Sequence, residues 1–119
     1  MISSAIPVLR IVDEAAARAF YGDFLGFTFD WEHRFDPDAP LYAQAHRDDL
    51  VLHLTGHVGD ATPGATVFIR VTDIAALHAE LNAKHHRHLR LDLVTQAWGT
   101  TMEVADPFGN RLRFCQSHG

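Results

Sequence analysis

The chain repeats itself once, about 60 residues further on. The stretch AIPVLRIVDEAAARA, which contains Arg10, returns as ATVFIRVTDIAALHA, in which Arg70 takes the same place. A period this long that occurs only twice does not fit a solenoid, whose shorter units stack many times. The repeat instead predicts two similar modules, residues 1–58 and 65–119, which are joined by loop 56–64 and close one core.

Each module is predicted to fold as a strand, a helix and three further strands. Asp13 in the first module, and Thr72 or Asp73 in the second, can accept hydrogen bonds from the free backbone N–H groups that begin a helix. Gly26 is expected to end the first helix in a left-handed conformation. Alternation of polar and apolar residues predicts the strands. The expected helices are 15–25 and a segment ending near Lys84, and the expected strands include 27–31, 41–45, 49–55, 90–94, 101–105 and 111–114.

The side-chain period of two sorts each strand into two faces. One face is apolar in both modules and is expected to pack beneath the helices. The opposite face is mixed, and on it His53 and Arg113 occupy positions related by the repeat. This mixed face is therefore expected to form a surface shared by both modules. The apolar face consists of Leu9, Ile11, Leu52, Leu54, Ile69, Val71, Leu112 and Phe114.

Length and composition narrow the class of protein. With 119 residues, 47% of them hydrophobic and 21% charged, the chain fits one globular domain, residues 1–119. Asp and Glu number 15 against 10 Lys and Arg, a formal net charge of −5, which disfavours nucleic acid and favours a cationic or neutral partner. No signal peptide is recognisable and no apolar run approaches the roughly 20 residues that span a bilayer, so a cytoplasmic protein without membrane contact is expected. The single cysteine, Cys115, excludes an internal disulfide.

Four short motifs carry a resemblance to a known family. PVLRIVD, ARAFYGDFLGF, QAWG and DPFGNR, in this order, resemble the vicinal oxygen chelate superfamily, and within it the bleomycin resistance proteins and their glyoxalase-like relatives. The resemblance implies an α+β fold in which two βαβββ modules form a cupped mixed sheet, usually in a homodimer, with module exchange between chains as one route to it. Asp106, Gly109 and Asn110 of the last motif suit a turn and are assigned to folding.

The resemblance also locates a metal position. Enzymes of the superfamily hold a divalent metal in the cup, and their four ligand positions fall here on Ile6, His53, Thr66 and Arg113. Only His53 offers a good ligand atom, because Ile6 has no lone pair, Thr66 is a weak neutral ligand and Arg113 is permanently positive. We therefore expect no metal, no cofactor and no catalytic residue at this place. The histidine-rich stretch 84–88 is interpreted as a solvated basic loop.

The leading functional hypothesis is binding without reaction. A flat, cationic small molecule of the bleomycin type would be sequestered in two symmetric clefts at a dimer interface. Trp98 in QAWG matches the tryptophan that bleomycin-binding relatives stack on the flat tail of the drug. Phe29 and Trp31 alternate with Phe27 on one strand face, so core packing is an equally good interpretation for them. The expected ligand-binding residues are Trp98, Trp31, Phe29, Phe35, Tyr42, His53, Arg113 and Glu32.

Three alternatives stay open. The protein could be a metal-dependent lyase, isomerase or ring-cleaving dioxygenase of the same superfamily, a binder for another aromatic metabolite, or a metal-free acid–base enzyme using His53 or Glu32. Metal analysis of the untagged wild type and of His53→Ala separates the first alternative from simple binding, and a ligand screen separates the second.

Overall fold

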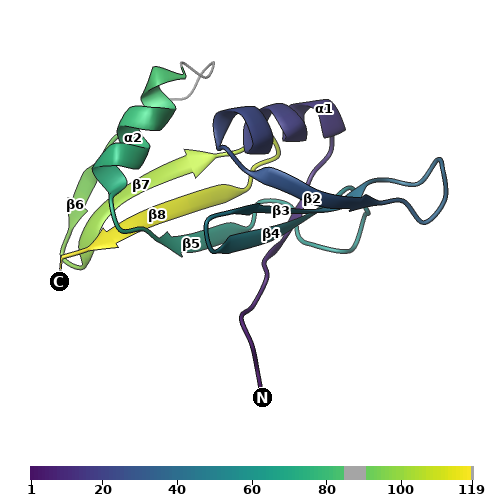
Figure 1. The fold of residues 1–119 in the computed structure, drawn as a ribbon, viewed down its shortest axis with the longest axis horizontal. Coiled ribbons are helices and arrows are strands. Elements are labelled where there is room, and N and C mark those ends of the chain that lie inside the picture. Colours follow the sequence, from purple (N-terminus) through teal and green to yellow (C-terminus); the bar gives the residue numbers. More distant parts are fainter. Residues whose placement is uncertain (85–90, 119) are drawn as a thin grey trace.

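The computed structural model describes residues 1–84 and 91–118 and arranges them as two four-stranded mixed sheets with the helices on one side (Figure 1). The strand orders are β1-β4-β3-β2 and β5-β8-β7-β6. In each sheet the first two strands are parallel and the other neighbours are antiparallel. The predicted fold of two βαβββ modules is confirmed. The elements of the first module are β1 (Val8–Arg10), α1 (Glu14–Ala17), η1 (Arg18–Phe24), β2 (Thr28–His33), β3 (Tyr42–Arg47) and β4 (Leu50–Thr55), and those of the second are β5 (Thr66–Arg70), α2 (Ile74–Ala83), β6 (Val94–Gln96), β7 (Gly99–Ala105) and β8 (Arg111–Ser117).

The two helices begin in the same way. The Asp13 carboxylate accepts from the Ala16 N–H at 3.0 Å, and the Asp73 carboxylate accepts from the Ala76 N–H at 3.1 Å. Of the two caps considered for the second helix, Asp73 is thus the one used. The helix ends near Lys84, as predicted.

The first helix continues differently, because after one α-turn it widens into the π-helix η1. The Leu25 N–H bonds the carbonyl of Phe20, five residues earlier, and this wider turn buries Phe20 and Tyr21. Gly26 ends the helix at φ 76, the predicted left-handed conformation.

The predicted strand at 90–94 is wrong in its position. The strand β6 begins only at Val94 and ends at Gln96, where it pairs with β7. Position 90 and the histidine-rich segment at 85–88 lie outside the described residues. Alternation over five residues could not fix this register, because the partner strand that selects it follows later in the chain.

One core lies between the helices and both sheets. Seven of the eight residues predicted for the apolar face are buried in it, and Val71 packs against it partly buried. Burial at this interface holds the helices on one side of the sheets and leaves the opposite face free of them (Figure 1).

A buried hydrogen-bonded group of Tyr21, Asp106 and Asn110, called here the polar knot, joins the two modules. The Tyr21 hydroxyl donates to the Asp106 carboxylate at 2.6 Å, and the Asn110 amide donates to the same carboxylate at 2.8 Å. Asn110 also donates to the carbonyl of Arg10 and accepts from the N–H of Ala65, so it ties the first module to the start of the second. Burial, reinforced by the Asp106 carboxylate, raises the pKa of Tyr21 far above its ordinary value. The folding role predicted for the DPFGN turn agrees with these contacts.

Within residues 1–84 and 91–118, no helix has the length and apolar character needed to cross a membrane.

Candidate functional site

The candidate site is the sheet face opposite the helices, called here the open face. Trp31 of β2 is 42% exposed and Phe68 of β5 is 53% exposed, although large aromatic side chains are normally buried. Both belong to the face that the helices do not cover. An exposed apolar surface of this kind is typical of a site that binds a ligand or another protein.

A β-bulge in β2 turns Trp31 onto the open face. Phe29 lies opposite Ala45 on β3, whereas Trp31 lies opposite Gln44, so one extra residue, Asp30, interrupts the alternation. Phe29 therefore stays on the helix side, where it packs against the core with the Arg18 guanidinium 5.4 Å from its ring centroid. The prediction that Phe29 and Trp31 share one face is wrong, because regular alternation cannot anticipate a bulge.

Three of the predicted ligand-binding residues meet on the open face. The rings of Trp31 and Tyr42 lie nearly parallel, with an interplanar angle of 9° and centroids 6.0 Å apart. The imidazole of His53 stands edge-on to both rings, with centroids 5.3 Å from Trp31 and 5.2 Å from Tyr42. Stacked and edge-to-face contacts at these distances are favourable for aromatic rings. The group forms a partly exposed aromatic platform.

A chain of hydrogen bonds supports this platform from β2, β3 and β4. His53 Nδ1 lies 2.7 Å from the Tyr42 hydroxyl, and His53 Nε2 lies 3.0 Å from Gln44 Oε1. The Gln44 amide donates to the Asp30 carboxylate at 3.1 Å, and His46 Nδ1 lies 2.6 Å from the same carboxylate. We call these five residues the His53 network. The hydrogen bond from Gln44 lowers the pKa of Asp30 below its ordinary value, and the hydrogen bond and the charge of His46 act in the same direction.

Asp30, Gln44 and His46 of this network are absent from the predicted ligand-binding residues, and Gln44 is the one that contacts His53 directly. It lies in the alternating run LYAQA, and only its polar character on the face opposite Ala43 and Ala45 could have drawn attention to it. Asp30 reaches it only because of the bulge, for which the sequence gives no local sign.

The residues at the superfamily's metal position do not fit a divalent ion. Both ring nitrogens of His53 already have hydrogen-bond partners. The Arg113 guanidinium is ion-paired with Glu103 at 3.0 Å, and Ile6 and Thr66 supply no strong ligand. Among the described residues, no three His, Cys, Asp or Glu side chains are grouped so that they could hold a metal ion.

Arg113 lies on the open face of the second module. It pairs across the sheet with Glu103, at the register that His53 and Gln44 occupy in the first module. Both side chains of the ion pair are close to half exposed. The second module thus presents charge where the first presents a hydrogen-bonded imidazole.

Glu32 and Phe35 do not join the aromatic platform. Glu32 lies opposite Ala43 and is ion-paired with Arg18 of η1 at 2.6 Å, and the hydrogen bond from Arg18 holds the pKa of Glu32 below its ordinary value. Phe35, 71% exposed, lies in the loop after β2 between the rings of His33 and His57, at centroid distances of 4.5 and 5.3 Å.

Trp98 occupies the tight turn between β6 and β7 and is 60% exposed. Gly99, which follows Trp98 and begins β7, lets this strand lie close to β8, because a Cβ atom there would lie 2.4 Å from the carbonyl oxygen of Gln116. Within the described part of the chain, Trp98 makes no ring contact with the platform. The chain therefore presents its two tryptophans separately.

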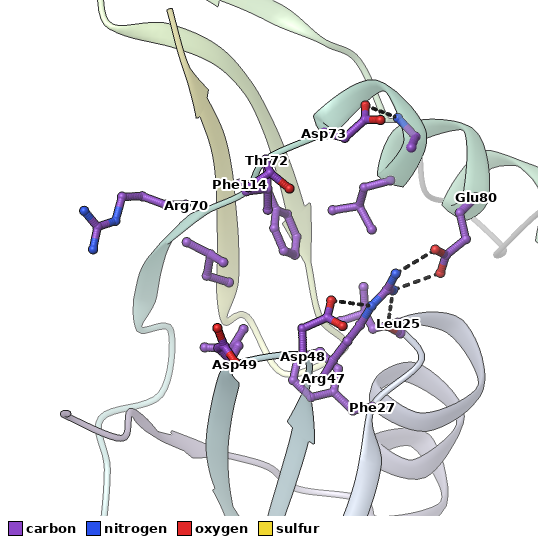
Figure 2. Close-up of a pocket in the computed structure, with 15 residues that line it drawn as sticks. Leu25, Phe27, Arg47, Asp48, Asp49, Arg70, Thr72, Asp73, Glu80 and Phe114 are labelled. Atoms are coloured by element: carbon purple, nitrogen blue, oxygen red, sulfur yellow. Dashed lines mark hydrogen bonds and ion pairs between the residues drawn. The ribbon is translucent and has the colours of Figure 1, made fainter. Parts of the chain in front are cut away.

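A cavity of about 440 Å³ lies elsewhere, between α2, the β3–β4 turn and β5 (Figure 2). It is lined by apolar side chains such as Phe114, and the ion pair of Arg47 with Glu80 at 2.7 Å forms part of its wall. None of the eight predicted ligand-binding residues lines this cavity. The ion pair joins the two modules, whereas the hydrogen bond that Arg47 donates to the carbonyl of Leu25 lies within the first module.

Comparisons with known proteins agree with this architecture. The family model described as glyoxalase superfamily protein matches residues 1–119. Comparison with curated protein sequences gave no significant match.

Solved structures similar to this chain include antibiotic-binding proteins. The bleomycin resistance determinant encoded on transposon Tn5 is 25% identical, with a TM-score of 0.78 over 99% of this chain and 100% of the other. The bleomycin-binding protein from Streptomyces verticillus, solved with copper(II)-bleomycin, is 30% identical, with a TM-score of 0.68 over 99% of this chain and 98% of the other. The antibiotic-binding protein TnmS3 from Streptomyces sp. CB03234 shares the fold at 21% identity and a TM-score of 0.72, over 98% of each chain. With a family model matched along its whole length, the chain belongs to the glyoxalase superfamily, and it has bleomycin-binding proteins among its relatives.

Proposed function

We propose that this protein is a cytoplasmic homodimer that binds and sequesters a flat, cationic small molecule of the bleomycin type without transforming it. The observation that carries the proposal is the exposed aromatic platform of Trp31, Tyr42 and His53, at the place where enzymes of the superfamily would hold their metal. Relatives at 25 and 30% identity are a bleomycin resistance determinant and a bleomycin-binding protein.

Stacking can supply the affinity. A planar ligand ring against an indole or phenol contributes about 0.5–1.5 kcal/mol beyond the apolar area that it buries. Trp31 and Trp98 both expose large parts of their rings, so each can accept such a contact. A binder of this kind needs no reacting group.

The proposed dimer would complete a site that one chain leaves open. Phe68 and Trp98 are more than half exposed, and residues 1–6 are exposed and extend away from the sheets (Figure 1). A two-fold dimer could cover this surface and bring the Trp98 turn of one protomer near the platform of its partner, forming two equal clefts. Exchange of modules between chains is one way to build such a dimer.

The charge balance favours a cationic ligand. The chain carries a formal net charge of −5, and the Asp30 carboxylate lies on the open face within the His53 network. Arg113 is the opposing charge on the open face, and its ion pair with Glu103 offsets it. A ligand with a flat ring system and a positive group suits both features.

Isothermal titration with copper-free and copper(II)-bleomycin tests the proposal. Trp31→Ala and Trp98→Ala should each weaken binding by about tenfold, because each loses one ring contact and the area it buries. Asp48→Asn is the matched control, since its side chain is 93% exposed at the β3–β4 turn beside the separate cavity. No heat with either form of the drug, or unchanged affinity in both tryptophan variants, would reject the proposal.

A further inference from the structure

The bulge that exposes Trp31 also determines the hydrogen bonds beneath it. Because Asp30 is the extra residue, its carboxylate reaches the open face and lies within hydrogen-bond distance of both Gln44 and His46 on β3. A carboxylate can only accept hydrogen bonds, and the lowered pKa of Asp30 keeps it ionised. The Gln44 amide must therefore turn its NH₂ group toward Asp30.

This orientation fixes the proton on His53. With its NH₂ group on Asp30, Gln44 presents its carbonyl oxygen to His53 Nε2 at 3.0 Å. A carbonyl oxygen accepts, so the Nε2 atom carries the proton, and in the neutral imidazole the Nδ1 atom is left as an acceptor. The Tyr42 hydroxyl, 2.7 Å away, then donates to Nδ1. With a neutral His53, each hydrogen bond from Asp30 through Gln44 and His53 to Tyr42 thus has one defined direction.

The hydrogen bond between Tyr42 and His53 also orients the exposed ring of Trp31. The hydroxyl is held at one end of the Tyr42 ring while the ring lies 9° from parallel with Trp31. The His53 ring stands edge-on to both at 71° and 77°, so it also limits rotation of the indole. A stacking surface that is already ordered loses less conformational entropy when the ligand binds.

We propose that His53 is a positioning residue, which as the neutral Nε2–H tautomer holds Tyr42 and Trp31 in one orientation for stacking by the planar ligand. The position that carries a metal ligand in enzymes of the superfamily thus serves here to order an aromatic platform. The part about the ligand rests on the proposed function, whereas the tautomer and the ordered rings are properties of the protein alone.

Nitrogen-15 spectra of the histidines at neutral pH test the tautomer directly. The His53 signals, assigned by their loss in His53→Asn, should show a protonated Nε2 and an unprotonated Nδ1. In Gln44→Leu, which removes the acceptor for Nε2, this preference should weaken. Protonation of Nδ1 rather than Nε2 in the wild type would overturn the proposal.

Fluorescence anisotropy of Trp31 tests the positioning. The chain has two tryptophans, so Trp98→Phe leaves Trp31 as the only tryptophan, which is excited at a wavelength that the tyrosines do not absorb. In that background, His53→Leu and Tyr42→Phe should each increase the fast rotation of the indole, whereas His53→Asn, whose amide oxygen can accept from Tyr42, should restore part of the order. His78→Leu is the matched control, since His78 lies on α2 and bonds the carbonyl of Leu91. Unchanged rotation in both His53→Leu and Tyr42→Phe would overturn the proposal.

Affinity links the positioning to the ligand. In the wild-type tryptophan background, His53→Leu should weaken bleomycin binding by about three- to tenfold, and His53→Asn by less. Failure of the wild type to bind bleomycin would reject the proposed function, while the spectra would still decide the positioning. If the wild type binds and His53→Leu binds equally well, the role in ligand binding is wrong. Should His53→Leu fail to fold, Tyr42→Phe keeps both rings and removes only the hydrogen bond.

Discussion

The two modules share a backbone plan but differ on the face that remains open. At the same cross-strand register, His53 pairs with Gln44 in the first module and Arg113 pairs with Glu103 in the second. The first pair belongs to a hydrogen-bonded network that includes the stacked ring of Tyr42, whereas the second is a partly exposed ion pair. The difference shows that exposed positions can diverge in chemistry while the strand pairing persists.

The buried side of the modules differs much less. Leu52 and Leu54 of β4 correspond to Leu112 and Phe114 of β8, and all four are buried. Apolar volume is what the helices require of these positions, and substitutions that keep it are tolerated. The need for packing therefore keeps the two modules alike on the buried face of the sheets, whereas the side chains on the open face can differ between them.

The largest expected loss of stability comes from the β7–β8 turn, where Asp106 joins the two modules. Asp106→Ala should lower the free energy of unfolding by about 3–5 kcal/mol, because it leaves the buried Tyr21 hydroxyl and Asn110 amide without their shared acceptor. Urea denaturation measures this loss. Asp38→Ala, in an exposed loop of the first module, is the control and should stay within about 0.5 kcal/mol. A loss below 1 kcal/mol for Asp106→Ala would mean that the knot does not hold the modules together.

Paired glycine substitutions give the next largest effect. Gly99→Ala should destabilise the protein by about 1–3 kcal/mol, because the new methyl group would press on the backbone of Gln116 and displace the Trp98 turn. Gly22→Ala in η1 meets only ordinary contact, 3.7 Å from Phe29, and should be neutral or slightly stabilising. Thermal unfolding gives the stabilities and titration gives the affinity for bleomycin. Equal stability of both variants would show that β6 and β7 can shift freely.

The fold could be predicted from the sequence because the repeat, the two Asp caps and the alternating strands are local patterns. The open face could be predicted only in part. Nothing near Asp30 marks a bulge, so Phe29 was expected beside Trp31. Likewise Gln44 became significant only when a carboxylate from another strand reached it, since such contacts depend on register rather than on neighbouring residues. The site is formed by hydrogen bonds between strands, and such bonds cannot be predicted from short sequence motifs.

Acid titration tests one ion pair between the modules, Arg47–Glu80, and one within the first module, Arg18–Glu32. The hydrogen bond from Arg47 holds the pKa of Glu80 below its ordinary 4.5, and the bond from Arg18 does the same for Glu32. A lowered folded pKa means that the stabilisation is complete above 4.5 and is lost as the pH falls through the folded value. The side chains of both pairs are 29–42% exposed and so partly screened by solvent, and Glu80→Gln and Glu32→Gln should each cost about 0.2–1 kcal/mol at neutral pH. Unfolding curves above and below pH 4.5 should show a shallower acid loss in each variant, and an unchanged slope in both would contradict this account.

Grafting the first module's pair onto the second should have the smallest effect on stability. The double change Arg113→His and Glu103→Gln removes one positive and one negative charge, so the net charge stays the same, and it replaces a surface ion pair that contributes about 0.2–1 kcal/mol. The free energy of unfolding should therefore change by less than about 1 kcal/mol, as chemical denaturation can measure. The single change Glu103→Gln controls for an unpaired but exposed Arg113. A loss of more than 2 kcal/mol, well beyond the surface-pair range, would mean that the second module needs its ion pair to fold, and that the two open faces are not interchangeable.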